Sequence, residues 1–186
     1  MGKRSDFERR PRDNYPTPYE AVLPLLPHLT PQTYFAEPCA GDAALIDHLA
    51  VHGHICVWAS DIEPRRMDVH EADARKCAVG GVAGAIITNP PWSRPDLHAI
   101  ICNLARRRPT WLLFDADWPH TIQAAPYLPL LRKIVAVGRV KWIPDSKFTG
   151  KDNCCWYLFD ANRSGPIEFV GRTKAQPDLL TLESAD

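Results

Sequence analysis

The stretch Gly84-Ala85-Ile86-Ile87-Thr88-Asn89-Pro90-Pro91-Trp92 decides how this chain is interpreted. Its first five residues form a short apolar run, which is typical of a buried strand in a parallel sheet. The two prolines end the strand and remove two backbone donors, and Pro91 biases Pro90 toward an extended conformation. We expect a stiff turn that presents an amide, a backbone carbonyl and an indole ring. Such a turn can accept hydrogen bonds from a planar NH2 group and stack on its ring. The alternative is a proline-rich strand end without chemistry.

A strand, a tight loop and a helix are expected upstream of this turn. Residues 33–37 read as a strand, residues 38–42 as the loop and residues 43–52 as a helix with an apolar face. In a parallel α/β sheet, such a loop lets backbone amides and a helix N-terminus approach a bound cofactor. The loop has no phosphate-binding sequence, so a nucleoside triphosphate is not expected.

The following strand, 55–59, ends beside an acidic residue. Asp61 lies 20 residues after Gly41, the usual offset for a carboxylate that binds ribose hydroxyls. A carboxylate suits this role because it accepts hydrogen bonds from both hydroxyls at once. A plain surface turn is the alternative interpretation. Periodicity in the rest of the chain predicts helices at 18–29, 94–108 and near 121–131, and strands at 67–70, 110–114, 134–143 and 154–159.

Length and composition indicate one globular α/β domain of ordinary hydrophobicity. The chain has 186 residues, of which 45% are hydrophobic and 24% charged, with 22 basic and 22 acidic side chains. We expect a flexible basic N-terminus at 1–12, a domain at 13–170 and an acidic tail at 171–186. No apolar run is long enough to span a bilayer, and no signal peptide is visible. The six cysteines show no Cys-x-x-Cys pairing, which favours reduced thiols in the cytoplasm.

With Asn89-Pro90-Pro91-Trp92, the sequence resembles the amino-methyltransferases that use S-adenosylmethionine, whose signature is Asp/Asn/Ser-Pro-Pro-aromatic. The resemblance covers residues 13 to about 160, because further motifs occur in the order of the members whose cofactor motif comes first. The class I pattern Glu/Asp-Pro-x-x-Gly-x-Gly is matched from Glu37, with Ala43 in place of its second glycine. We expect the methyl group of Ala43 to press toward the cofactor.

The resemblance implies a single Rossmann-like class I methyltransferase domain. Its mostly parallel seven-stranded sheet would end in an antiparallel hairpin and carry helices on both faces. Glu37 would face the methionine amino group of the cofactor, Asp61 the ribose, and Asp73 the adenine amino group. The implied cofactor residues are Thr17, Pro18, Glu37, Pro38, Ala40, Gly41, Asp61, Ile62, Asp73, Ala74 and Asn89.

The resemblance also implies direct methyl transfer at the proline turn. The Asn89 side-chain oxygen and the Pro90 carbonyl would accept hydrogen bonds from the acceptor NH2, with Pro91 stiffening the turn and Trp92 stacking on the acceptor ring. Strand ends at this edge of the sheet line the crevice, so further substrate-side candidates follow. They are Trp118, His120, Lys147, Phe148 and Lys151. His120 is either a base or a pocket wall, and the lysine loop either contacts phosphates or is simply solvated. No metal site is expected, since His48, His52 and His54 read as surface and loop residues.

The expected acceptor is N6 of adenine in DNA, because the chain looks like the compact adenine methyltransferases of phages and prophages. It is too short for a separate target-recognition domain, so sequence preference should be weak or come from a partner protein. Nucleic acid is therefore the expected partner, with DNA favoured over RNA and no membrane. The alternatives are cytosine N4, guanine N2 in RNA, glutamine in proteins, and a cofactor-binding regulatory protein without turnover.

Overall fold

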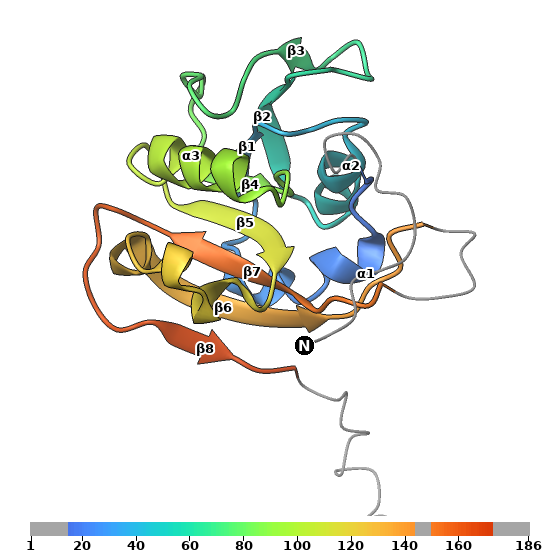
Figure 1. The fold of residues 1–186 in the computed structure, drawn as a ribbon. Helices are drawn as coiled ribbons and strands as arrows, with labels where there is room; N and C mark the ends of the chain where they lie inside the picture. Colours follow the sequence, from blue (N-terminus) through green and yellow to red (C-terminus); the bar gives the residue numbers. More distant parts are fainter. Residues whose placement is uncertain (1–14, 144–149, 173–186) are drawn as a thin grey trace, which may run out of the picture.

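The computed structural model describes residues 15–143 and 150–172, and these form a single eight-stranded sheet with helices on both faces (Figure 1). The strand order is β3-β2-β1-β4-β5-β7-β6-β8. The strands are β1 (Tyr34–Glu37), β2 (Ile55–Asp61), β3 (His70–Glu71), β4 (Ala85–Thr88), β5 (Thr110–Asp115), β6 (Leu131–Gly138), β7 (Cys154–Phe159) and β8 (Glu168–Val170).

Strand direction divides the sheet into a parallel half and an antiparallel part. Strands β3, β2, β1, β4 and β5 are mutually parallel, whereas β7 runs antiparallel to both β5 and β6. Strand β8 adds to the outer edge of β6 in parallel. The α/β fold with a mostly parallel sheet and an antiparallel hairpin is thus confirmed, and β8 is an eighth strand beyond the seven expected.

The helices cover opposite faces of the sheet. Since neighbouring residues of a strand point to opposite sides, β4 contributes side chains to the core on both faces. Helix α3 (Arg94–Leu104) packs with Ile86 of β4 in one core cluster. Helices α1 (Tyr19–Val22) and α2 (Ala44–Val51) pack with Ile87 in the other. Figure 1 shows α3 and α2 on the two sides of β1 and β4. Since both faces are covered, all four residues of β4 are buried.

Two expected helices are wrong, and prolines account for both. The helix expected at 18–29 is the four-residue α1 followed by a 3-10 turn, η2 (Leu26–His28). The helix expected near 121–131 is a series of 3-10 turns, η3 (Trp118–His120), η4 (Ile122–Ala124) and η5 (Leu128–Leu130). Pro24 and Pro27 lie inside the first segment and Pro126 and Pro129 inside the second. A proline inside an α-helix removes a backbone donor and clashes with the preceding turn.

The other differences concern the ends of elements. Helix α3 ends at Leu104 rather than at 108, and β6 occupies Leu131–Gly138 rather than 134–143. Strand β3 is His70–Glu71 rather than 67–70. Residues 1–12 and most of the tail from 171 lie outside the described part of the chain. Within the described part, no helix reaches the length and apolarity that crossing a bilayer requires.

Candidate functional site

A cavity of about 340 Å³ lies where the parallel strands β1, β2 and β4 end. Carboxyl ends of parallel strands meet at one edge of the sheet, so the loops that follow them converge there. All of the expected cofactor residues except Pro18 line this cavity. They are Thr17, Glu37, Pro38, Ala40, Gly41, Asp61, Ile62, Asp73, Ala74 and Asn89. The motifs identified separately along the chain therefore share one site.

Glu37 brings a buried carboxyl group to the cavity wall. Its side chain is 1% exposed, and Oε2 has no hydrogen-bond partner among the residues that the structure describes. Burial raises the pKa of Glu37 well above its ordinary value, and the nearby carboxylate of Asp61 adds to the effect. A buried acceptor without a partner is costly, and a ligand that carries a cationic amino group would satisfy it.

Asp61 holds the loop that follows β1. Its Oδ2 accepts a hydrogen bond from the Gly41 backbone N–H at 2.8 Å, and its Oδ1 accepts one from the Glu63 N–H at 2.8 Å. Gly41 itself has φ 53°, a left-handed conformation that glycine adopts at little cost. An ionised carboxylate offers about four lone-pair sites. Asp61 can therefore fix the loop and still accept hydrogen bonds from hydroxyls of a ligand.

Ala43 occupies the place of the second motif glycine and is the N-cap of α2. It has φ 64°, so a non-glycine residue adopts the left-handed conformation here. Its side chain is fully buried in a small apolar cluster with Ala40, Ala59 and Val69, and it does not line the cavity. The expectation that its methyl group presses toward the cofactor is therefore wrong, because the methyl group packs within the fold.

Asp73 reaches the cavity from the loop after β3 and is paired with a cation that sequence reasoning missed. It accepts hydrogen bonds from Arg75 Nε at 2.9 Å and Nη2 at 2.8 Å, and these lower its pKa. Arg75 Nη1 also donates to Asp96 Oδ1 of α3 at 2.8 Å. Arg75 and Asp96 line the cavity. They are 21 positions apart in sequence, and no local pattern links them.

The acceptor turn Asn89–Trp92 is joined to the N-terminal segment. Asn89 Nδ2 donates to Thr17 Oγ1 at 3.2 Å, and Thr17 is 5% exposed. The amide nitrogen is thus committed to Thr17, so the carbonyl oxygen is the acceptor that this side chain can offer to a substrate. Pro91 lines the cavity, whereas the neighbouring Pro90 is buried and is not part of the lining.

Trp92 lies beside the cavity and is not part of its lining. Its indole N–H donates to the Leu113 carbonyl at 3.2 Å, and its ring contacts Trp142 edge-on, with centroids 5.6 Å apart and planes at 88°. The ring also packs against both core clusters. The indole is therefore held in a fixed orientation next to the turn.

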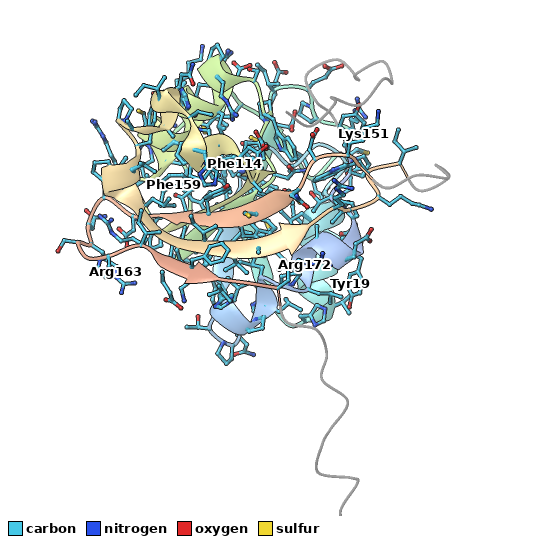
Figure 2. The ribbon with its side chains drawn as sticks, turned by 60° about the horizontal axis from the view of Figure 1, so that its bottom comes forward. Tyr19, Phe114, Lys151, Phe159, Arg163 and Arg172 are labelled. Atoms are coloured by element: carbon cyan, nitrogen blue, oxygen red, sulfur yellow. The ribbon has the colours of Figure 1, made fainter. Side chains whose placement is uncertain are left out.

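The substrate-side candidates are not brought together at the cavity. Trp118 is fully buried in the core, where its N–H donates to His98 Nε2 at 3.1 Å, so its side chain is unavailable to a substrate. His120 is exposed in η3 and does not line the cavity. Lys147 and Phe148 lie outside the described residues. Lys151 is exposed and does not line the cavity, and Figure 2 shows it at the upper right of the view, far from Arg163 at the lower left.

The described residues contain no group of three or more His, Cys, Asp or Glu side chains that could hold a metal ion. The three clustered histidines have other contacts. Tyr19 hydrogen-bonds His52 at 2.9 Å and packs edge-on against His48, whereas His54 Nδ1 accepts the Thr33 N–H at 3.2 Å. All six cysteines are free.

Comparison with known proteins supports the fold. No family model and no curated protein sequence matches the chain. Among solved structures, the chain resembles a Listeria monocytogenes protein provisionally described as a class I S-adenosylmethionine-dependent methyltransferase, with 11% identity and a TM-score of 0.52 over 87% of this chain. It also resembles the 23S rRNA methyltransferase ErmE, with 14% identity and a TM-score of 0.54 over 81%.

A third similar structure is the methyltransferase subunit of a type I restriction-modification system from Streptococcus thermophilus, with 8% identity and a TM-score of 0.51 over 84% of this chain. The chain spans 65% of the Listeria protein, 71% of ErmE and 47% of the restriction-modification subunit. At these identities the likeness defines the fold, which is the Rossmann-like α/β fold of class I methyltransferases.

Proposed function

We propose that this chain transfers a methyl group from S-adenosylmethionine to an exocyclic amino group, most readily N6 of adenine in DNA, with little sequence specificity. One observation carries the proposal. The buried carboxyl of Glu37, whose Oε2 has no hydrogen-bond partner among the described residues, and the amide of Asn89 line a single cavity, from the ends of the adjacent strands β1 and β4. An acceptor for a cationic amino group thus stands next to an acceptor for a neutral NH2 group.

The acceptors around the cavity fit the cofactor. Glu37 suits its ammonium group, Asp61 its two ribose hydroxyls and Asp73 its adenine amino group, since each offers a carboxylate to hydrogen-bond donors. A volume of about 340 Å³ lies within the usual range for small-molecule sites. When bound, the cofactor would supply an electrophilic methyl group on a sulfonium.

Asn89 and Pro90 would orient the acceptor. The Asn89 oxygen and the Pro90 carbonyl accept hydrogen bonds from the NH2 group and turn its nitrogen lone pair toward the cavity. Thr17 fixes the amide through its hydrogen bond with Asn89 Nδ2, so little reorientation is needed. Such positioning is the main source of rate in a direct in-line transfer. Trp92, held by Leu113, supplies an aromatic side to the turn.

A nucleic-acid base is the preferred acceptor because the Asn-Pro-Pro-Trp turn resembles that of the adenine enzymes. One similar structure is named as a type I restriction-modification methyltransferase and another as an rRNA methyltransferase. A base within a duplex must be flipped out, which costs a few kcal/mol. A single strand or a partner protein lowers this cost, so single-stranded DNA should be methylated faster than duplex.

The test is transfer of labelled methyl groups to duplex DNA, single-stranded DNA, RNA and protein extract, followed by digestion and mass spectrometry of the product. We expect N6-methyladenine, with more label in single-stranded than in duplex DNA. Label in RNA alone would move the acceptor to RNA, and label only in protein would overturn the nucleic-acid proposal. Cofactor binding without transfer to any acceptor would favour the regulatory alternative.

Two substitutions separate the proposed roles. Asn89→Ala should reduce transfer to background and leave the Kd of the cofactor within about threefold of wild type, a binding change below 1 kcal/mol. Asp61→Ala should weaken cofactor binding first, because it removes both the ribose acceptor and the support of the Gly41 loop. Calorimetry measures the binding and circular dichroism checks the fold. Equal loss of binding in both variants would contradict this division of roles.

A further inference from the structure

A line of charged and polar side chains connects the cofactor side of the cavity with the acceptor turn. It starts at Asp73, which holds Arg75 with both carboxylate oxygens. Arg75 Nη1 donates to Asp96 Oδ1 at 2.8 Å, and Ser93 Oγ donates to Asp96 Oδ2 at 2.6 Å. Ser93 directly follows Trp92 and is the N-cap of α3. The two ends of the line thus belong to the two halves of the proposed site.

The Ser93 hydroxyl links the N-cap of α3 to Asp96. The Ser93 side chain makes no capping hydrogen bond to the helix backbone, because its hydroxyl is committed to Asp96. The Ser93 carbonyl instead accepts the Leu97 N–H at 2.9 Å, which closes the first helical turn. Arg75, from outside the helix, therefore fixes a carboxylate that orients the residue next to the acceptor turn.

We propose that Arg75 is a positioning residue that couples cofactor binding to acceptor binding, an inference that rests on the proposed function. Asp73, Arg75 and Asp96 all line the cavity. A hydrogen-bond donor of the ligand that binds Asp73 competes with Arg75 for the carboxylate oxygens. Arg75 then makes fewer hydrogen bonds to Asp73 and binds Asp96 more strongly. Cofactor binding thereby makes the segment beside the acceptor turn more rigid. By linkage, acceptor binding should strengthen cofactor binding in turn.

Arg66 provides a matched control within the same chain. Like Arg75, it bridges two carboxylates, with 2.8 Å to both oxygens of Asp47 and 2.7 Å from Nε to Asp68. It does not line the cavity. A general loss of surface ion pairs would affect both arginines alike, whereas the coupling belongs to Arg75 alone.

The first test measures the Kd of S-adenosylhomocysteine by calorimetry, with and without a saturating single-stranded adenine-containing oligodeoxynucleotide. We expect the oligonucleotide to lower this Kd about fivefold or more in the wild type, which is a typical coupling between two sites. Arg75→Gln and Asp96→Asn should each bring the factor close to one, and the double variant should go no further. Arg66→Gln should keep the wild-type factor. An unchanged factor in Arg75→Gln would overturn the proposal.

The second test needs no acceptor and so separates this inference from the proposed function. Hydrogen exchange is followed at the amides of Trp92, Ser93 and Leu97, with S-adenosylhomocysteine as the only ligand. The ligand should slow this exchange about fivefold in the wild type, because it favours the ordered form of this segment, and much less in Arg75→Gln. Equal slowing in both proteins would refute the role of Arg75. If the oligonucleotide fails to bind while Arg75 still controls exchange, the acceptor is wrong and the coupling stands.

Discussion

At the scale of single residues, Glu37 has opposite effects on stability and on binding. Its carboxyl is buried in the cavity wall with Oε2 unpartnered, and burial raises its pKa. Before a ligand arrives, this group destabilises the fold, since a buried polar atom without a partner costs about 1–3 kcal/mol. The same group becomes an acceptor when a cationic amino group enters the cavity.

Glu37→Gln should stabilise the unliganded protein at pH 7, because a neutral amide replaces a carboxyl that is costly to ionise when buried, and it should weaken cofactor binding at least about tenfold. The folded-state pKa of Glu37 lies above its unfolded value, so the folded protein binds more protons and loses stability as pH rises above about 4.5. The gain from the substitution should thus fade as pH falls toward 4.5. Urea unfolding at several pH values measures it.

The exposed Glu71 of β3 provides the control for this substitution. Glu71→Gln removes the same charge from the same sheet, so it should change neither the free energy of unfolding nor the cofactor Kd appreciably. A Glu37→Gln protein that is less stable than wild type at pH 7 would show that an unseen partner satisfies the buried carboxyl.

Single positions also show how far the sequence leads. The offset between Gly41 and Asp61 predicts that they meet, and the structure joins them by a hydrogen bond of 2.8 Å. The pairing of Arg75 with Asp96 could not be predicted, because it depends on how the loop after β3 lies against α3. Trp118 shows the opposite error. Its place after β5 indicates the crevice, but the turn η3 directs its ring into the core.

At the scale of elements, the four-residue helix α1 is held by tertiary contacts. So short a helix has little stability of its own. The indole N–H of Trp156 in β7 donates to the Ala21 carbonyl at 2.8 Å, in a buried contact across 135 positions of sequence. This contact positions the segment that delivers Thr17 to the cavity and to Asn89.

Trp156→Phe should lower the free energy of unfolding by about 1–3 kcal/mol beyond the effect of the smaller ring. The reason is that the buried Ala21 carbonyl loses its hydrogen-bond donor. Trp111→Phe is the matched control, as Trp111 is 4% exposed in the same core cluster. Urea unfolding compares the two variants. Limited proteolysis near α1 should be faster in Trp156→Phe, and equal rates in the two variants would contradict an anchoring role.

The elements that the sequence predicts best are those with uninterrupted apolar runs. Strands β4 and β7 lie where such runs indicate, since burial on both faces leaves a clear signal. The helix predictions for 18–29 and near 121–131 were wrong because these segments contain prolines. Hydrophobic periodicity does not show how prolines change the conformation of a whole segment. Tertiary packing keeps these segments compact as 3-10 turns.

At the scale of the whole molecule, protonation of histidines should make the free energy of unfolding depend on pH. Burial lowers the pKa of His28, His54 and His98. His54 Nδ1 accepts the Thr33 N–H, and His98 Nε2 accepts the Trp118 N–H, so protonation at these nitrogens removes an acceptor. Because their folded-state pKa values lie below the unfolded ones, the unfolded chain binds more protons in acid. Stability should therefore fall as pH drops below about 6.5.

His54→Asn should reduce this loss by about 1 kcal/mol at pH 5.5, because the asparagine oxygen can replace Nδ1 as acceptor and does not titrate there. His70→Asn, at an exposed position of β3, is the control and should leave the pH dependence unchanged. The measurement is the free energy of unfolding in urea at pH 7.5 and 5.5. An identical pH dependence in wild type and His54→Asn would rule out His54 as a contributor.

The margins of the sheet have a consequence for how this protein behaves when concentrated. One margin is the two-residue strand β3 and the other is the three-residue strand β8. A long, flat edge strand exposes a row of unpaired peptide groups that can pair with extended segments of other chains. Short edge strands are one of the ways in which proteins avoid this. Copies of this molecule should therefore have little means of joining sheet to sheet, which suits preparation at the high concentrations that crystallisation and calorimetry require.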